Sequence, residues 1–217
     1  MKVKRMLYLV LMFLPLAATL VALWYLPDTI PAHYGADGQV NRWGSKYEML
    51  ILPLMIPLFG LFMLAMAKVA KKQEKTGENN EKVCLMGGLV FLVIFNAMAF
   101  YFLYAGMQQT ERLDSLPVDL SQLLFGLLGI GLIVMGNVMP KARKNSVLGL
   151  RTSWSMKDET AWKKSQRAGG ICLMAAGLGM LLCSILTKGW LCFGLSMGLL
   201  LAATAAGAIY SYWVASK

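Results

Sequence analysis

Six uncharged apolar segments constrain the fold of this 217-residue chain more than any other feature. They run from Met6 to Leu26, Met49 to Ala67, Val83 to Met107, Leu120 to Pro140, Ala168 to Thr187 and Gly189 to Ser216. A helix needs about 20 apolar residues to cross a hydrocarbon core of about 30 Å, because each residue advances it by about 1.5 Å. None of the segments alternates as a strand does. The sequence therefore predicts an all-α membrane protein with six transmembrane helices.

Composition and the first segment support lipid as the solvent. The chain is 58% hydrophobic and 15% charged, and a water-soluble domain would have to expose much of that apolar surface. The basic start MKVKR resembles a signal peptide, but the segment Met6 to Leu26 exceeds the roughly 7–15 residues of a signal core. Pro27-Asp28 offers no cleavage site. We expect this segment to remain as the first span.

The basic residues predict the direction of threading, because cytoplasmic connections are enriched in Lys and Arg. Of the 21 Lys and Arg residues, 17 lie at the two termini and in the second and fourth connections, and 4 lie in the other connections. Both termini and the inner loop 139–168 are therefore predicted to be cytoplasmic. The net charge of +10 is explained by topology, so direct binding to nucleic acid is not expected. The expected partner of the basic loops is anionic lipid at the inner face.

Three regions follow from the order of the segments. Residues 1–69 form a two-helix region with an outer loop at 27–46, residues 70–138 hold the third and fourth spans, and residues 139–217 hold the inner loop and the last two spans. The sixth segment places Gly194, Gly198, Ala202 and Ala206 four residues apart, and the fifth does so with Ala175 and Gly179. Such rows favour close packing in lipid, so we expect an antiparallel hairpin of the last two spans.

The four cysteines lie in or beside apolar segments. They are Cys84, Cys172, Cys183 and Cys192. We expect them to pack as small apolar side chains, and a disulfide between Cys183 and Cys192 across the outer turn is the alternative.

The outer loop reads LPDTIPAHYGADGQVNRWGSK and is too particular for a simple link. Asp37-Gly38 and Gly44-Ser45 are turn dipeptides, so the loop is predicted to form a compact cap. His33 is the single histidine of the chain, which excludes a site with several histidines. It is expected to hold the loop by hydrogen bonds, and a mixed metal site with Asp28 or Asp37 is the alternative.

The inner loop combines a basic amphipathic pattern with residues that such a pattern does not require. Ser155 and Asp158 match a capping box, which predicts a short helix from Met156 towards Arg167 with Trp162 at the membrane interface. Binding of the lysines to anionic headgroups explains only part of this loop. It does not explain Asn145, Gly149, Arg151, Thr152 and Trp154.

Both loops resemble the SdpI family of bacterial toxin-immunity membrane proteins. The outer loop is similar to the family's pattern LPD-x-IP-x-H followed by WGSK, within an N-terminal domain of unknown function. The inner loop resembles GN-x2-PK, an Asn and RT-x-W, followed by Trp. Matching positions in the inner loop are Gly136, Asn137, Pro140, Lys141, Asn145, Gly149, Arg151, Thr152, Trp154, Trp162, Arg167 and Gly170. The chain departs from the pattern at Lys144 and Ser153, where the family has Pro, and at Gln166, where it often has His.

The resemblance implies an immunity or signal-transduction protein that protects the cell against a secreted peptide toxin and also recruits a cytoplasmic repressor. The expected contacts with the peptide, at the outer face, are Asp28, His33, Tyr34 and Trp43. The expected docking residues for the cytoplasmic partner are Asn145, Arg151, Thr152, Trp154 and Trp162. No catalytic residues, metal or other cofactor is expected.

Two other classes of function compete with this interpretation. An enzyme is not favoured, because the chain has no H-E-x-x-H, G-x-S-x-G or Walker A motif. A small transporter or exporter of peptides or hydrophobic compounds is the alternative, but its spans would be expected to carry ionisable residues. Asn96 is the one strongly polar group near the middle of a span, and it is open to interhelical hydrogen bonding or to contact with a substrate.

Overall fold

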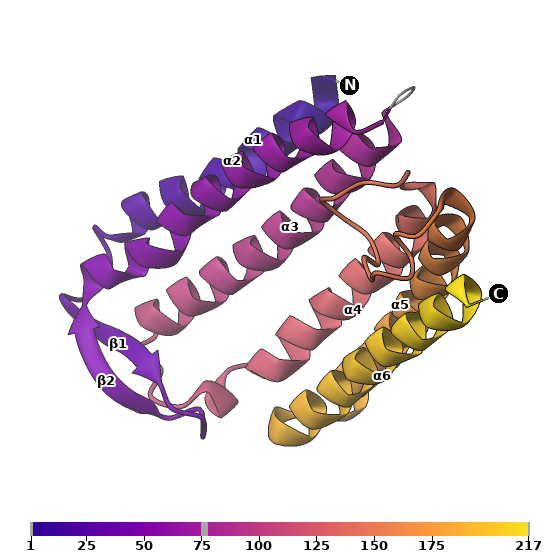
Figure 1. Cartoon of the computed structure of the whole chain (residues 1–217). Helices are drawn as coiled ribbons and strands as arrows, with labels where there is room; N and C mark the ends of the chain where they lie inside the picture. The colour runs from indigo at the N-terminus through magenta and orange to yellow at the C-terminus, as the bar shows by residue number, and fades with distance from the viewer. Residues whose placement is uncertain (1, 75–77, 217) are drawn as a thin grey trace. The chain divides into compact units, whose positions relative to one another are not determined.

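The computed structural model describes residues 2–74 and 78–216 and is mostly helical (Figure 1). The helices are α1 (Lys2–Ala22), α2 (Ile51–Lys72), α3 (Asn79–Met107), α4 (Leu120–Val138), α5 (Glu159–Leu186) and α6 (Gly189–Ala215). Two strands, β1 (Thr29–Tyr34) and β2 (Val40–Ser45), and three short 3-10 helices, η1 (Lys46–Leu50), η2 (Leu113–Ser115) and η3 (Met139–Lys141), complete the described elements.

Five of the described helical segments are long and apolar enough to cross a membrane. They are Lys46–Lys72, Asn79–Met107, Leu120–Lys141, Glu159–Leu186 and Gly189–Ala215. The first apolar helix is shorter by this measure and extends over Met6–Ala22. The prediction of a mostly helical chain is therefore confirmed, with five helices of membrane-spanning length and composition among the described residues against the six spans predicted.

The chain divides into two compact units. One consists of Met1–Leu61 and Phe91–Leu120, and the other of Phe62–Val90 and Ser121–Lys217. The first unit contains the outer loop, and the second contains the inner loop.

A β-hairpin corrects the all-α prediction for the outer loop. Strands β1 and β2 pair antiparallel, with Ile30 opposite Gly44 and Pro31 opposite Trp43, and the register shifts between Pro31 and Tyr34. At the tip, the Gly38 amide donates to the Gly35 carbonyl at 3.0 Å, and Gly38 has φ +75°, which a residue without Cβ adopts easily. The predicted turn at Asp37-Gly38 is thus the tip of a hairpin.

The hairpin forms hydrogen bonds with a third segment, residues 111–113, and its base packs against helices of its own unit. Val40 N donates to the Glu111 carbonyl at 2.9 Å, and Leu113 N donates to the Gly38 carbonyl at 2.9 Å. At its base, Ile30 is 1% exposed in a cluster with Ala22, Leu26 and Leu103. These contacts make the outer loop an ordered cap.

Asn96 makes the interhelical hydrogen bond that was one of its two predicted roles. Pro15 has no N–H, so the Leu11 carbonyl loses its usual donor within α1. Asn96 Nδ2 replaces that donor at 2.8 Å, and it also donates to the Leu92 carbonyl of its own helix at 2.7 Å. Asn96 is 6% exposed, so the pair is shielded from water. The side chain therefore compensates for the proline in the neighbouring helix.

The predicted short inner helix from Met156 to Arg167 is wrong in both of its limits. Helix α5 begins at Glu159 and continues to Leu186, so the amphipathic segment and the fifth span are one helix. Asp158 is the N-cap, and its Oδ1 accepts from Thr160 N and Ala161 N, each at 2.8 Å. The backbone N–H of Ala161 is the main reason that the pKa of Asp158 is lowered.

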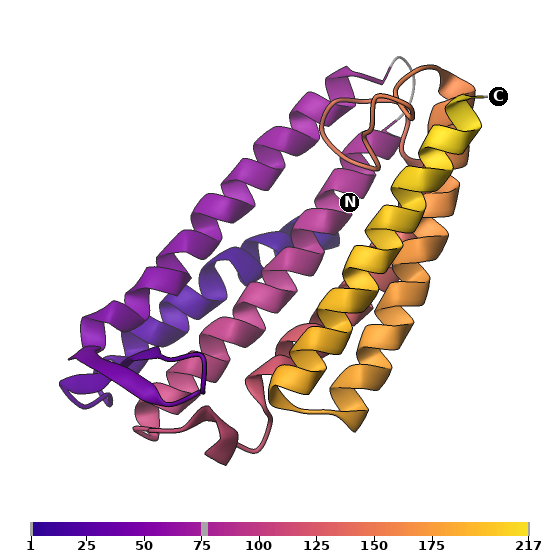
Figure 2. The same cartoon turned by 60° about the horizontal axis from the view of Figure 1, so that its bottom comes forward.

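Helices α5 and α6 form the predicted antiparallel hairpin (Figure 2). The predicted glycine face of α6 is wrong, however, because a Cβ at Gly194 or Gly198 would meet no atom within 4 Å. The close approach of backbones lies between α4 and α5, where a Cβ on Gly177 would come within 2.5 Å of the Gly129 carbonyl oxygen. Gly136 and Gly170 face each other in the same way. The four cysteines are all free, which corrects the alternative of a disulfide.

The link between Asn96 and Leu11 predicts a coupling with Pro15. Asn96→Ala should lower the free energy of unfolding by about 1 kcal/mol, the usual scale of such bonds in membrane proteins. The loss should be smaller in a Pro15→Ala background, because α1 then supplies its own donor to Leu11. Unfolding of the four variants in mixed micelles measures this double-mutant cycle. An equal loss in both backgrounds would contradict the assigned role of Asn96.

Candidate functional site

Two ion pairs fasten the base of the outer hairpin. Lys46 Nζ lies 2.9 Å from Asp28 Oδ1, and Arg42 forms a two-pronged pair with Glu48, with nitrogen–oxygen distances of 3.1 and 2.7 Å. The hydrogen bond and charge of Lys46 lower the pKa of Asp28, so the pair persists until the pH falls through that lowered value. Asp28, a predicted peptide contact, therefore has a structural partner.

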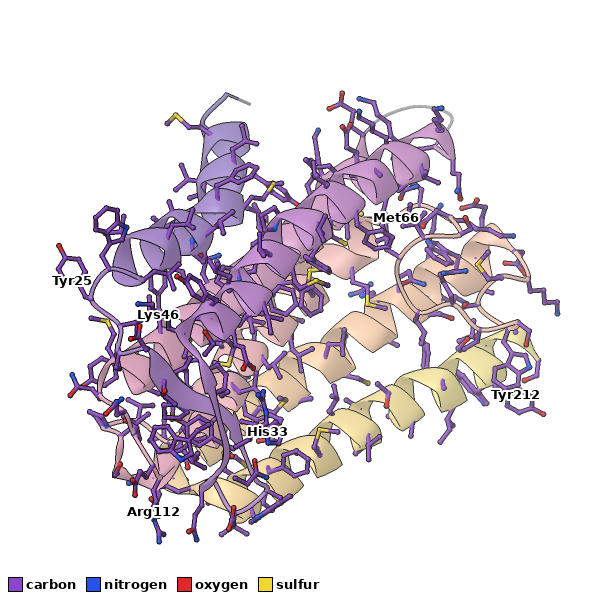
Figure 3. All side chains as sticks on the ribbon, turned by 90° about the vertical axis from the view of Figure 1, so that its left-hand side faces the viewer. Tyr25, His33, Lys46, Met66, Arg112 and Tyr212 are labelled. Carbon is purple, nitrogen blue, oxygen red and sulfur yellow. The ribbon has the colours of Figure 1, made fainter. Side chains whose placement is uncertain are left out.

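His33 and Tyr34 lie next to each other on β1 and have different environments. His33 is exposed, and its Nδ1 lies 2.7 Å from Asn41 Oδ1 on β2, which agrees with the predicted holding of the loop (Figure 3). The Tyr34 hydroxyl is partly buried and donates to the Thr110 carbonyl at 2.9 Å. Burial raises the pKa of Tyr34. Tyr34 thus joins the hairpin to the segment before η2.

Large aromatic side chains surround this cap. Trp43 is 44% exposed on β2, and Trp24, Tyr25 and Tyr47 are more exposed still. Rings with polar edges are typical of the boundary between lipid and water. Of the four predicted peptide contacts, Asp28, His33 and Trp43 are exposed and Tyr34 is partly buried, and the Asp28 carboxylate is engaged by Lys46.

The alternative of a mixed metal site at His33 finds no support in the cap. Asp28 is paired with Lys46, and Asp37 Oδ1 accepts from Gln39 N at 3.1 Å. Within residues 2–74 and 78–216, no group of three His, Cys, Asp or Glu side chains is placed to hold a metal ion.

Asn145 shapes the inner loop from within. Its Oδ1 accepts from Val147 N at 2.8 Å and Leu148 N at 2.9 Å, and its Nδ2 donates to the Arg143 carbonyl at 2.7 Å. It is 3% exposed, so the predicted docking role is wrong for this side chain. An amide suits this position because the backbone of the turn presents two N–H donors and one carbonyl acceptor that are not paired with other backbone groups.

Trp162 is likewise internal, which corrects its prediction as an interfacial or docking residue. It is 0% exposed and packs against Val83 and Ala142. Its Nε1 donates to the Ala142 carbonyl at 2.8 Å. This bond satisfies the one polar atom of a large apolar side chain, so Trp162 joins the start of α5 to the inner loop.

Gln166 is the residue that sequence reasoning missed. It was noted only as a departure from the family pattern, yet its Oε1 accepts from Leu150 N at 2.8 Å and its Nε2 donates to the Leu150 carbonyl at 2.9 Å. The side chain is fully buried and pairs with the backbone as a neighbouring strand would. The sequence offered one signal for this role, a glutamine three residues before Gly169-Gly170, since its amide supplies both a donor and an acceptor.

Thr152 connects the inner loop to α6. Its Oγ1 lies 2.6 Å from Ser211 Oγ and accepts from Ser155 N at 3.0 Å. Ser155 Oγ accepts from Thr152 N at 2.9 Å and donates to the Leu150 carbonyl at 2.7 Å, so this hydroxyl serves the loop, and Asp158 caps α5. Thr152 is therefore a half-buried link between the inner loop and α6, and its docking role stays a prediction.

Arg151 and Trp154 remain exposed on the inner loop. Trp154 is 41% exposed and stands edge-on to the Tyr212 ring at a centroid distance of 5.1 Å. Arg151 forms no ion pair among the residues that the structure describes. Of the five predicted docking residues, these two present side chains that a cytoplasmic partner could contact.

Comparison with known proteins finds matches to the regions that contain the two loops. Residues 10–56 match a domain of unknown function, DUF1648, and residues 141–212 match the SdpI/YfhL protein family. The chain is 26% identical over 188 residues to the Immunity protein SdpI of Bacillus subtilis (strain 168), covering 85% of this chain and 83% of that protein. It is 41% identical over 44 residues to an uncharacterized protein of Archaeoglobus fulgidus, covering 20% of this chain and 24% of that one. No solved structure matches significantly.

These matches confirm the resemblance inferred from the loop motifs. Together with the apolar helices, they identify a multi-pass protein of the bacterial cell membrane. Residues 141–212 match the SdpI/YfhL family and residues 10–56 match DUF1648, so the chain is similar to membrane proteins of the SdpI type.

Proposed function

We propose that this chain is an immunity protein that protects the cell against a secreted peptide toxin. The observation that carries this proposal is similarity to the Immunity protein SdpI over 85% of the chain, which includes both loops. The proposed protection is non-catalytic and rests on binding. The alternative of transport has no comparable support from similarity. Asn96 donates its amide nitrogen to two backbone carbonyls, and its Oδ1 has no hydrogen-bond partner among the described residues.

The orientation that fits this function has six spans and both termini in the cytoplasm. It rests on the unequal basic residues, and it counts α1 as the first span. The hairpin cap is then outside, where a secreted peptide arrives, and the inner loop faces the cytoplasm.

The cap is suited to meeting an amphipathic peptide at the outer interface. A peptide that damages bilayers partitions first into that layer. The exposed ring of Trp43 offers apolar area there, and His33 adds a polar group on the neighbouring strand. Ordered by its ion pairs and by Tyr34, the cap loses little conformational freedom on binding.

Arg151 and Trp154 are the proposed contacts for a cytoplasmic repressor. Both are exposed on a loop in which Asn145 and Ser155 are buried and bonded internally. A charged fork beside an aromatic ring is a common recognition pair at protein interfaces. A peptide bound outside would signal by favouring one of two states of this loop.

The proposed threading predicts which positions an impermeant thiol reagent reaches on intact cells. In a background without the native cysteines, Asp37→Cys and Ser115→Cys should react, and Ser153→Cys should react only after the cells are opened. Gly77, also predicted to be inside, lies outside the described residues. Reaction of Ser153→Cys on intact cells would contradict the orientation.

Protection should depend on the exposed side chains of the cap. Cells that express the chain should survive a challenge with candidate secreted toxins, and His33→Ala with Trp43→Ala should reduce survival at least severalfold at equal abundance in the membrane. Glu111→Ala is the matched control, because it is also an exposed side chain of the outer segment. If the double variant protects as well as the parent, the cap is not the contact surface.

Substitutions in the inner loop should abolish docking of the repressor without reducing protection against the toxin. Arg151→Ala and Trp154→Ala should release a cytoplasmic repressor from the membrane fraction while survival and abundance stay unchanged. Lys144→Ala removes a basic side chain of the same loop as the control. A parallel loss of abundance and survival would assign these two residues to stability instead.

A further inference from the structure

A groove lies between the loop-side ends of α5 and α6 and belongs to neither of the sites above. Its volume is about 520 Å³. It is lined by the cations Lys164 and Arg167, the rings of Tyr210 and Trp213, and the apolar side chains of Ile171 and Val214. Figure 2 shows the two helices side by side along their length. One depression thus combines positive charge, aromatic rings and aliphatic surface.

The helical spacing places these side chains in two facing rows. Lys164, Arg167 and Ile171 are three and four residues apart on α5, so they share one face of that helix. Tyr210, Trp213 and Val214 share one face of α6 in the same way. Because the helices are antiparallel, both rows meet near the start of α5 and the end of α6.

The two cations of this groove have no acidic partner. Lys164 and Arg167 are exposed, and neither forms an ion pair with the described residues. Two positive charges beside each other attract an anion and gain most from one that both can contact. A phosphodiester supplies such an anion, and Arg can bind it through two parallel hydrogen bonds.

Along the groove, the lining changes from charged to apolar side chains, in the order expected for the headgroup and acyl chain of a phospholipid. Helix α5 has 28 residues, about 42 Å, which exceeds a hydrocarbon core of about 30 Å. Leu186, at its far end, is 77% exposed and lies within the apolar segment. Counting about 20 residues back from there places Arg167 at the edge of the hydrocarbon layer, with Ile171 inside it.

We propose that this groove binds one anionic phospholipid, with its phosphate between Lys164 and Arg167 and an acyl chain along Ile171 and Val214. The rings of Tyr210 and Trp213 form the wall at the level of the glycerol. In the orientation proposed above, the lipid belongs to the inner leaflet. The groove has this composition whether or not the chain confers immunity, so the two proposals can fail separately.

Native mass spectrometry of the purified full chain in detergent tests the site. Titration with phosphatidylglycerol should show one lipid bound at least tenfold more tightly than phosphatidylcholine. Lys164→Gln with Arg167→Gln should lower that affinity about tenfold or more, as expected for the loss of two basic contacts. Lys163→Gln with Lys144→Gln removes equal charge outside the groove and should leave the affinity nearly unchanged.

A third variant separates the groove from general attraction of charge. Ala168→Leu keeps both cations but narrows the groove, because Ala168 also lines it, and it should weaken phosphatidylglycerol binding. Equal affinity for phosphatidylcholine, or equal loss in the control pair, would overturn the proposal. Competition by millimolar inorganic phosphate at the same affinity as the lipid would show a free-phosphate site and overturn it too.

Discussion

Both units depend on one constraint, which is that backbone N–H and C=O groups must find hydrogen-bond partners where no water is present. Lipid offers no partner to a peptide group, so each break in a helix needs a replacement from a side chain. Asn96 supplies a donor for Leu11 where Pro15 has none. Gln166 supplies both a donor and an acceptor for Leu150, and Asp158 satisfies the first amides of α5. These three polar side chains lie where the backbone departs from regular helix, whereas the buried Ser165 and Ser184 lie within α5 and Ser196 and Ser211 within α6.

The sequence allowed the helices to be predicted because the length of an apolar segment has a direct physical meaning in a bilayer. It did not reveal the hairpin, because Pro31 and the irregular alternation of its strands hide the pattern around Asp37-Gly38. The glycine contact was missed for a related reason. Gly129 and Gly136 are seven residues apart, as are Gly170 and Gly177, whereas the row of small residues predicted on α6 has a spacing of four. Spacing alone does not show which face of a helix meets a neighbour.

Residue type indicated where the candidate sites lie, but it did not show which residues face a partner and which residues hold the loop together. Asn145, Thr152 and Trp162 were expected to face a partner, and all three proved to be bonded within the protein. Polar and aromatic side chains in a loop serve either purpose, and only burial distinguishes them. Arg151 and Trp154 differ from these three in one respect, the exposure of their side chains. The basic groove was outside the reach of sequence reasoning, since its two rows come from separate helices.

The two loops are held by different kinds of force, and ionic strength therefore affects them differently. The outer hairpin is tied at its base by exposed pairs of full charges, whose attraction reaches about 8 Å at physiological salt and about 3 Å at 1 M. The inner loop is tied by buried hydrogen bonds between uncharged groups such as Gln166 and Leu150, which salt hardly screens. In the orientation proposed above, a bacterium moving from dilute water to brine would weaken the ion pairs of the outer cap and leave the hydrogen bonds of the inner loop unchanged. If the two loops act as proposed, the loop that meets the peptide responds to the salt of the habitat and the loop that contacts the repressor does not.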